Sequence, residues 1–316
     1  MSQDAPHLPA LLEQVVGFAV PAPGEWVVVD ATVGAGGHAA ALLRALGPTG
    51  RLLGLDRDRT AIELARARLA PFGDQVRLVH ASFADLGEVV KVHGWGRTDA
   101  VVYDLGVSSM QFDEPKRGFS YRFDEPLDMR MDPTQTFSAY DVVNSYDERD
   151  LLRVIRTFGE ERWAARIAKF IVRARTRAPI RTTGELVDVI RAAVPHAARR
   201  VGPHPARRTF QALRIEVNGE LDALESSLPQ ATAELASGGR LVALSYHSLE
   251  DRIVKRFMRE EASGEAPRLR LLTRKPVRPS ETEIAANPRA SAARLRAAER
   301  LAAPVPDDAG PGGTAA

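Results

Sequence analysis

WVVVDATVGAGGHAAALLRAL, residues 26–46, is the stretch of sequence that decides the fold. A short apolar run ends in Asp30, a glycine-rich turn follows, and an alanine- and leucine-rich segment then favours a helix. Glycine permits positive φ and lets the backbone approach a ligand closely, while the start of a helix offers free N–H groups. This strand, turn and helix are typical of a site that holds a nucleotide-like cofactor.

Further strands and helices alternate after this stretch. Apolar segments predict strands at 51–56, 76–80, 100–104 and 240–245, and helical periodicity predicts helices at 60–69, 86–92, 210–235 and 248–261, the last with Ser248 as its N-cap. A last strand is expected at 268–272. Buried strands that alternate with helices indicate βαβ units and a parallel sheet. We therefore expect an α/β fold of the Rossmann type.

The alternation breaks after the fourth predicted strand. Residues 105–136 are rich in Gly, Ser, Asp, Pro and Met, which is typical of a long functional loop, and residues 147–193 are helical in pattern, with a capping box from Thr182 to Glu185. We expect one discontinuous domain from residues 1–112 and 204–301, an inserted loop and all-helical domain at 113–203, and a disordered tail at 302–316.

Composition narrows the class of protein. The 316 residues include no cysteine, which excludes disulfides, thiolate metal sites and a cysteine nucleophile. No apolar run approaches the roughly 18 residues of a membrane span, and the first residues lack the pattern of a signal peptide. We expect a cytoplasmic protein with no membrane partner.

Charge is unevenly distributed although the net charge is only +2. Residues 149–214 hold 16 Lys and Arg against five Asp and Glu, and residues 268–278 hold five basic residues and no acid. Such blocks suggest a polyanionic partner such as nucleic acid. The alternative is that a chain with only five lysines simply covers its helices with arginine. Charge alone leaves both interpretations open.

The residues after the predicted strands bear on the cofactor. Residues 34–39 satisfy the G-x-G-x-x-G/A dinucleotide pattern, and Asp56, which ends the second strand, is placed to accept ribose hydroxyls. NAD and S-adenosylmethionine share that ribose. Asp30 favours the second, because a carboxylate there opposes a pyrophosphate but suits a cationic ligand. Phe83 is placed to pack on an adenine and Asp104 to lie near the transferring methyl, although capping and core packing are alternative roles.

Four longer motifs carry a resemblance to a known family. DLGVSS at 104–109, RGFS at 117–120, PLDMRMD at 126–132 and SYHSLEDR at 245–252 closely resemble the bacterial 16S rRNA (cytosine-N4)-methyltransferase family, and the match runs from about residue 7 to 300. The resemblance implies a Rossmann-like methyltransferase with an inserted helical domain. It implies S-adenosyl-L-methionine as cofactor, bound by Gly36, Gly37, His38, Asp56, Phe83, Asp104 and Gln111. Tyr246 stands where the family usually has Phe, and Ala31 where it usually has Gly.

The implied substrate is one cytidine in the decoding region of 16S rRNA, within the small ribosomal subunit, methylated at N4. Asp104 and Ser108 are the candidate catalytic residues. Phe119, Tyr121 and Phe123 are candidates to stack on the base, with packing of the loop as the alternative. The candidate substrate-binding residues are Ser109, Asp128, Arg130, Arg166, Lys169, Arg173 and Arg207.

Two other functions remain open from the sequence, a nicotinamide-dependent oxidoreductase that uses the same glycine loop and an RNA-binding ribosome assembly factor. No metal site is expected, because the histidines lack a ligand spacing such as H-x-x-x-H. The oligomeric state, monomer or homodimer, stays open.

Overall fold

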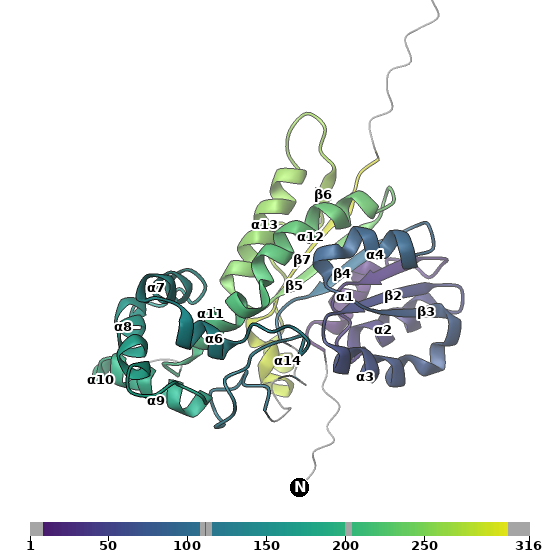
Figure 1. Ribbon diagram of the computed structural model, residues 1–316. Coiled ribbons are helices and arrows are strands. Elements are labelled where there is room, and N and C mark those ends of the chain that lie inside the picture. The colour runs from purple at the N-terminus through teal and green to yellow at the C-terminus, as the bar shows by residue number, and fades with distance from the viewer. Residues whose placement is uncertain (1–8, 108–110, 112–115, 200–203, 303–316) are drawn as a thin grey trace, which may run out of the picture.

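A computed structural model describes residues 9–107, 111, 116–199 and 204–302. Its centre is a seven-stranded sheet in the order β3-β2-β1-β4-β5-β7-β6 (Figure 1). The strands are β1 (Val27–Asp30), β2 (Arg51–Asp56), β3 (Val76–His80), β4 (Ala100–Asp104), β5 (Arg240–Ser245), β6 (Leu269–Leu271) and β7 (Arg294–Arg300). Strands β1 to β5 are parallel, and β7 is antiparallel to both of its neighbours. The strand order reverses between β1 and β4, where α/β sheets of this kind bind ligands.

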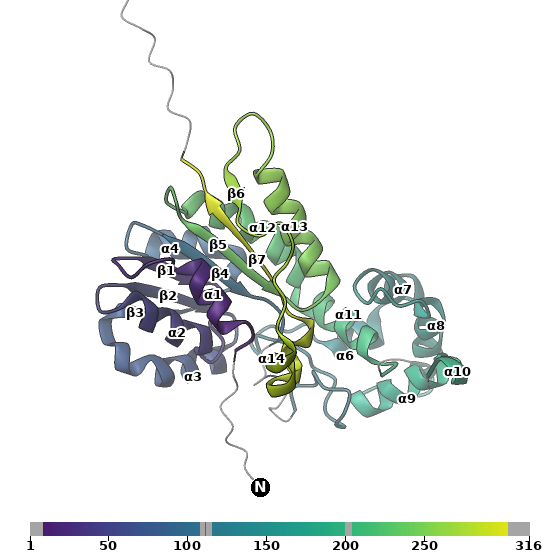
Figure 2. The ribbon, with the colours of Figure 1, turned by 180° about the vertical axis from the view of Figure 1, so that it is seen from behind.

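Helices cover both faces of the sheet, as Figures 1 and 2 show from opposite sides. One face packs against α1 (Leu12–Ala19), α2 (Gly37–Leu46) and α3 (Arg59–Leu69), and the other against α4 (Leu86–His93), α12 (Glu220–Glu234) and α13 (Ser248–Glu261). Neighbouring residues of one strand, such as Val28 and Val29, belong to opposite cores because side chains alternate along a strand. The predicted α/β class and the parallel sheet are confirmed.

The first five of the described helices between β4 and β5 in the chain lie to one side of the sheet in both views. They are α6 (Ala139–Ser145), α7 (Glu148–Thr157), α8 (Ala164–Arg175), α9 (Thr183–Ala193) and α10 (His196–Arg199). Their apolar faces form a separate core with Leu151, Ile167 and Leu186 at its centre. The capping box predicted at Thr182 and Glu185 opens α9. An inserted helical unit is therefore a feature of this fold.

Two local predictions were wrong, and one strand was not predicted. The helix predicted at 210–235 is two helices, α11 (Arg207–Asn218) and α12, because Gly219 at φ 58° ends the first in the left-handed region. The N-cap of α13 is His247, whose side chain accepts from the Glu250 N–H, rather than Ser248. The sequence analysis missed β7, because its run of Ala, Glu and Arg reads like a surface helix.

Short elements complete the chain: η1 (Ala70–Gln75), η2 (Phe83–Asp85), α14 (Glu281–Ala286) and η3 (Pro288–Ala292). Within the described ranges no helix has the length and apolar character needed to cross a lipid bilayer. The predicted tail at 302–316 lies outside the described residues apart from its first residue.

Asn218 joins the loop before α6 to the end of α11. Its Nδ2 donates to the Met129 carbonyl at 2.8 Å, and its Oδ1 accepts from the Met131 N–H at 2.8 Å. The side chain is buried, with 5% of its surface exposed. Because α11 leads directly to Gly219 and α12, this amide fixes the loop to the element that connects the helical unit with the sheet.

Replacing Asn218 by Ala should lower the free energy of unfolding by about 2 to 3 kcal/mol, since it leaves a buried N–H and a buried carbonyl without these partners. Urea denaturation with a comparison of midpoints and slopes measures the loss. Arg256→Ala, which removes an exposed ion pair with Glu225, is the control and should cost under about 1 kcal/mol. Equal losses in the two variants would contradict the role assigned to Asn218.

Candidate cofactor and methyl-transfer site

Three carboxylates meet at the carboxyl ends of β1, β2 and β4, namely Asp30, Asp56 and Asp104. Asp30 is buried, its Oδ1 accepts from the Thr32 N–H at 3.2 Å, and no described residue donates to its Oδ2. Burial raises the pKa of Asp30 to about 7; His38 and the Thr32 N–H oppose this rise, and the other two carboxylates add to it. The crevice between β1 and β4 thus holds an excess of acidic groups.

The glycine turn wraps around the carboxylate of Asp56. Its Oδ2 accepts from the Gly34 N–H at 2.9 Å and its Oδ1 from the Asp58 N–H at 2.8 Å. Burial raises the pKa of Asp56 to about 6, although both backbone donors work against the rise. A carboxylate has about four acceptor positions, so Asp56 retains the capacity to bind ribose hydroxyls.

Gly36 is required by its conformation and by its neighbours. Its φ is +78°, and a Cβ built there would lie 3.3 Å from Leu69 Cγ and 3.4 Å from Ala65 Cα on α3. The turn can therefore pass close to α3 only without a side chain. Gly37 and His38 then begin α2, as the sequence predicts for the anion- or ligand-facing start of a helix.

His38 lies between two acceptors. Its Nε2 is 3.0 Å from the Ala10 carbonyl oxygen and its Nδ1 is 3.2 Å from Asp104 Oδ2. Burial works to lower the pKa of His38, but Asp104 and Asp30 outweigh it and hold that pKa above its usual value. Because both ring nitrogens face oxygen acceptors, the imidazolium form satisfies the site best.

Tyr246 holds the other oxygen of the same carboxylate. Its hydroxyl donates to Asp104 Oδ1 at 2.7 Å, and burial together with Asp104 raises the pKa of Tyr246 well above its usual value. About a quarter of the Asp104 side chain stays exposed. Tyr246 was missed as a site residue in the sequence analysis, although its place at the end of β5, beside β4 in the sheet, was the signal that could have identified it.

Phe83 and Gln111 are held by residues near the carboxyl ends of β4 and β2. Phe83, half-buried in η2, packs edge-on against Tyr103 of β4 with ring centroids 5.8 Å apart. Gln111 is buried and its Nε2 donates to Asp58 Oδ2 at 2.8 Å, two residues beyond Asp56. The structure thus joins His38 to Asp104 directly and places Gln111 two residues from Asp56 through Asp58, while Ser108 and Ser109 lie outside the described residues.

The charges of the crevice test which cofactor fits. Asp30 and Asp104 both act on the His38 imidazole, Asp56 adds a third carboxylate near Asp30, and one buried carboxylate oxygen has no donor among the described residues. A pyrophosphate would add negative charge to this arrangement, whereas a ligand with a sulfonium and an ammonium group would offset it. The residues present therefore fit S-adenosylmethionine and do not fit a dinucleotide.

Comparison with known proteins agrees with this geometry. The family model described as "MraW methylase family" matches residues 4–301. The chain belongs to the MraW methylase family. Curated relatives named ribosomal RNA small subunit methyltransferase H are 54% identical in Thermobifida fusca (strain YX), over 94% of both chains, and 51% identical in Heliobacterium modesticaldum, over 93% of this chain and 98% of the relative. A third relative, from Symbiobacterium thermophilum, is 52% identical over 94% of this chain and 97% of the relative.

Membership of this methylase family excludes the nicotinamide-dependent alternative, and S-adenosyl-L-methionine is the cofactor. The predicted contacts at Gly36, Gly37, His38, Asp56, Phe83, Asp104 and Gln111 stay predictions for individual residues, since no ligand is present.

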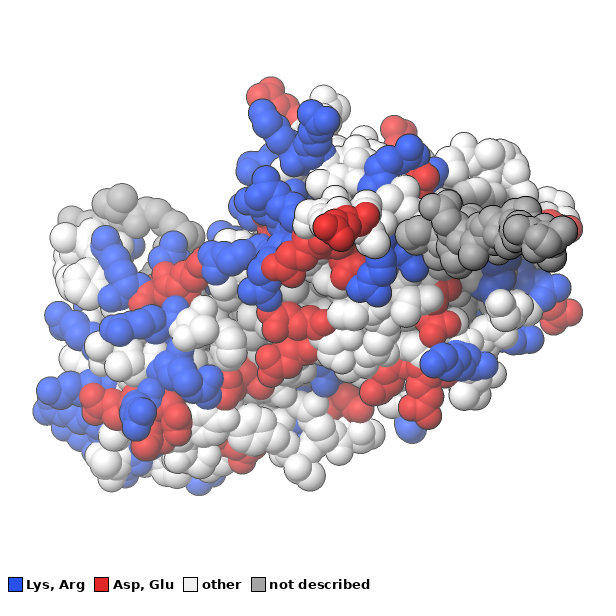
Figure 3. All heavy atoms as spheres, turned by 90° about the horizontal axis from the view of Figure 1, so that it is seen from above, with Lys and Arg blue, Asp and Glu red and all other residues white. Residues whose placement is uncertain are grey.

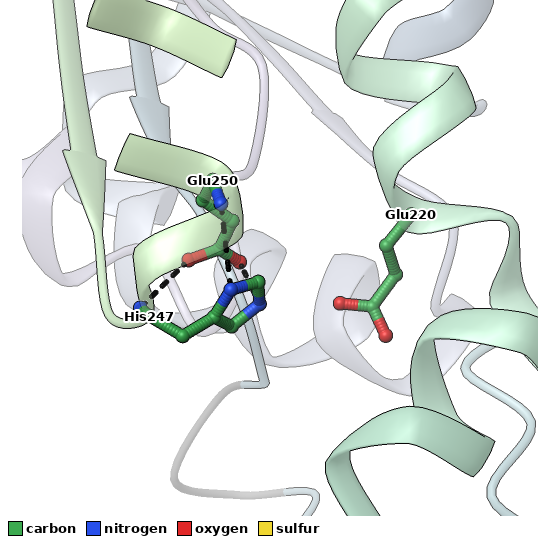
Figure 4. Close-up of side chains that lie close together, drawn as sticks. All are labelled: Glu220, His247 and Glu250. Carbon is green, nitrogen blue, oxygen red and sulfur yellow. Dashed lines mark hydrogen bonds and ion pairs between the residues drawn. The ribbon is translucent and has the colours of Figure 1, made fainter. Parts of the chain in front are cut away.

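A second group of ionisable side chains lies at the start of α13. Glu220, His247 and Glu250 approach one another closely enough to hold a metal ion (Figure 4). His247 Nε2 is 3.1 Å from Glu250 Oε1, and both oxygens of Glu220 accept from Arg214 at 2.8 Å. Burial works to raise the pKa of Glu250, but His247 and Arg214 outweigh it and lower that pKa. Arg214 therefore already occupies both oxygens of Glu220, and the group links α11, α12 and α13.

The residues expected to bind substrate fall into two sets. Asp128 and Arg130 pair with each other at 2.7 Å, and Arg130 also donates to the Pro133 and Gln135 carbonyls, so both stabilise their own loop. The basic residues Arg166, Lys169 and Arg173 are exposed on α8, and Arg207 is exposed at the start of α11. The second set is exposed to solvent and is placed to meet a large partner.

The pKa of Asp30 leads to a prediction about stability. Its folded value of about 7 exceeds the unfolded value of about 3.8, so the folded state binds more protons between these values and stability falls as pH rises from about 4 to 7. Asp30→Asn does not titrate. As pH rises from 4 to 8, the free energy of unfolding of the wild type should therefore fall relative to that of Asp30→Asn, by at most about 4 kcal/mol.

Urea denaturation at a series of pH values measures this difference. The exposed Asp74→Asn is the control, and its curve should run parallel to that of the wild type. Parallel curves for Asp30→Asn as well would show that the crevice does not perturb Asp30.

Proposed function

We propose that this protein methylates ribosomal RNA of the small subunit, and that the acceptor is N4 of one cytidine in the decoding region. The names of the curated relatives support the first part. The resemblance of DLGVSS and PLDMRMD to the cytosine-N4 family supports the second. The single observation that carries the proposal is Asp104, held at the end of β4 by His38 and Tyr246 beside the cofactor crevice.

The low nucleophilicity of the acceptor amine limits this reaction. The lone pair of cytosine N4 is delocalised into the ring, so the nitrogen is a poor nucleophile. S-adenosylmethionine, when bound, supplies a methyl group whose transfer breaks one C–S bond and forms one C–N bond. N4 must then lose a proton, and a fixed acceptor beside the amine takes up both the developing positive charge and that proton.

Asp104 is suited to this role by its two partners. His38 and Tyr246 each donate to one carboxylate oxygen, and each oxygen retains a further lone pair for the amine. The carboxylate is thereby fixed before substrate arrives, which avoids reorganisation during the reaction. A backbone carbonyl within 105–108 is the alternative acceptor, and Ser108 is proposed as a further catalytic contact.

The target base must leave its stack to reach this crevice. Of the three aromatic candidates, Phe119 is buried in the helical core and Tyr121 stacks on His204 with centroids 4.7 Å apart. Phe123 is 60% exposed and is the one that we propose as a stacking partner. Ser109, Asp128 and Arg130 are proposed to shape the pocket of the base from the same loop.

The helical unit at 113–203 is proposed to recognise rRNA. Arg166, Lys169 and Arg173 follow one another at helical spacing on α8, and no ion pair is found for them within the described part of the chain. Exposed cations without acidic partners on one helix suit a series of phosphates. Arg207 would continue this contact toward the sheet.

Small-subunit rRNA from cells that lack this protein should miss one methyl group on a cytidine, and the wild-type gene should restore it, as mass analysis of rRNA digests can show. Asp104→Asn should bind the cofactor in calorimetry but methylate at least about 100-fold more slowly at saturating substrates, because the amide cannot take the proton. Full turnover by Asp104→Asn would eliminate the acceptor role, and unchanged rRNA in deletion cells would refute the function.

The α8 triple variant Arg166→Gln/Lys169→Gln/Arg173→Gln should weaken binding of a 16S rRNA fragment and flatten its salt dependence by about 2 in the slope of log K against log salt. Fluorescence anisotropy at several salt concentrations measures both quantities. The control is Arg44→Gln/Arg66→Gln, which removes two exposed charges on α2 and α3, at a distance from the helical unit. Salt slopes that match the wild type would exclude α8 from the RNA interface.

A further inference from the structure

The helix α13 and the residues from 268 to 274, which include β6, carry two kinds of basic residues. Four arginines have acidic partners: Arg252 pairs with Glu160, Arg256 with Glu225, Arg268 with Glu261 and Arg270 with Glu299. For Lys255, Arg259 and Arg274 no ion pair is found within the described ranges, and all three are exposed. Acidic side chains are thus within reach of these elements, but none of these ion pairs involves the three cations.

These three cations line one small hollow. Its other walls are Thr273, Arg296 and the apolar side chains of Met258 and Leu271, and its volume is about 10 Å³. That space holds roughly one water-sized atom, so it admits a single phosphate oxygen and no base or sugar. Asp251 lies nearby but contacts Arg296 at 2.7 Å and Arg294 at 3.6 Å, so it leaves the three cations unbalanced.

The hollow is separate from the methyl-transfer site but connected to it by a rigid element. The helix α13 begins two residues after Tyr246, whose hydroxyl contacts Asp104. At 1.5 Å per residue, Lys255 and Arg259 lie about 10 to 17 Å along the helix from its start. This spacing is too long for a group of the methylated nucleotide and suits a phosphate farther along the same RNA.

Surface charge extends in the same direction. Figure 3 shows Lys and Arg gathered over the part of the molecule where α13 and β6 lie, with further Lys and Arg over the helical unit beside it. A face with this distribution of charge suits a long polyanion. Acidic side chains are interspersed, which favours contacts at particular phosphates over uniform attraction.

We propose that Lys255, Arg259 and Arg274 form a phosphate-binding site for rRNA that flanks the methylated nucleotide. The proposal rests on the function proposed above and extends the RNA interface from the helical unit to the methyltransferase domain. Long, exposed side chains from two elements suit the backbone of a polynucleotide, because they can follow it without reading its sequence.

The test compares Lys255→Gln/Arg274→Gln with the control Arg44→Gln/Arg66→Gln, which removes the same charge from α2 and α3. Two 16S rRNA fragments are used, a short hairpin around the target cytidine and a longer fragment that retains its flanking strands. The binding of each fragment is measured over a series of salt concentrations. For the longer fragment, the first variant should lose about 1 to 2 in the slope of log K against log salt and about 10-fold in affinity. The control should lose neither.

The short hairpin separates a local contact from a general effect of charge. Its affinity should be the same for the wild type and Lys255→Gln/Arg274→Gln, and the methylation rate at saturating RNA should be unchanged while KM for the longer fragment rises. The proposed site would be wrong if both variants gave equal salt slopes on the longer fragment. It would also be wrong if Lys255→Gln/Arg274→Gln lost as much affinity for the hairpin as for the longer fragment. Wild-type protein that binds neither fragment would overturn the proposed function itself and the site with it.

Discussion

A protonated histidine among carboxylates is the interaction on which the site depends. His38 donates toward Asp104 on one side and toward the Ala10 carbonyl on the other, and it lies close to the buried Asp30. Without this positive charge, the end of β1 and the end of β4 would place two carboxylates together in a buried crevice. The imidazolium makes that arrangement tolerable, while the remaining excess of negative charge favours a cationic cofactor over a dinucleotide.

The sheet and its cofactor turn could be predicted from the sequence because they depend on local signals. Apolar runs that end in Asp30, Asp56 and Asp104 define three strand ends, and parallel strands bring such ends to one edge. Gly34 and Gly36 are needed for positive φ within the same turn. Each of these features lies within a few residues, so the chain alone reveals it.

Features that depend on distant neighbours could not be predicted in this way. The strand β7 is stabilised by pairing with β5 and β6 and by the ion pair of Arg296 with Asp251, and none of these partners is close in sequence. The break at Gly219 separates two helices that share apolar periodicity. Tyr246 becomes a partner of Asp104 only when β5 lies beside β4.

The position of His38 also depends on a contact between the start of α1 and α14. The N–H of Leu11 donates to Glu283 Oε1 of α14 at 2.6 Å, and the neighbouring carbonyl of Ala10 is the one that fixes His38. Glu283 lies 179 residues after Asp104 in the chain, and its charge adds to the causes that raise the pKa of Tyr246. A carboxylate far along the chain thus holds the backbone that presents an acceptor to His38, so the orientation of one imidazole in the crevice depends on residues from both sides of the inserted helical unit.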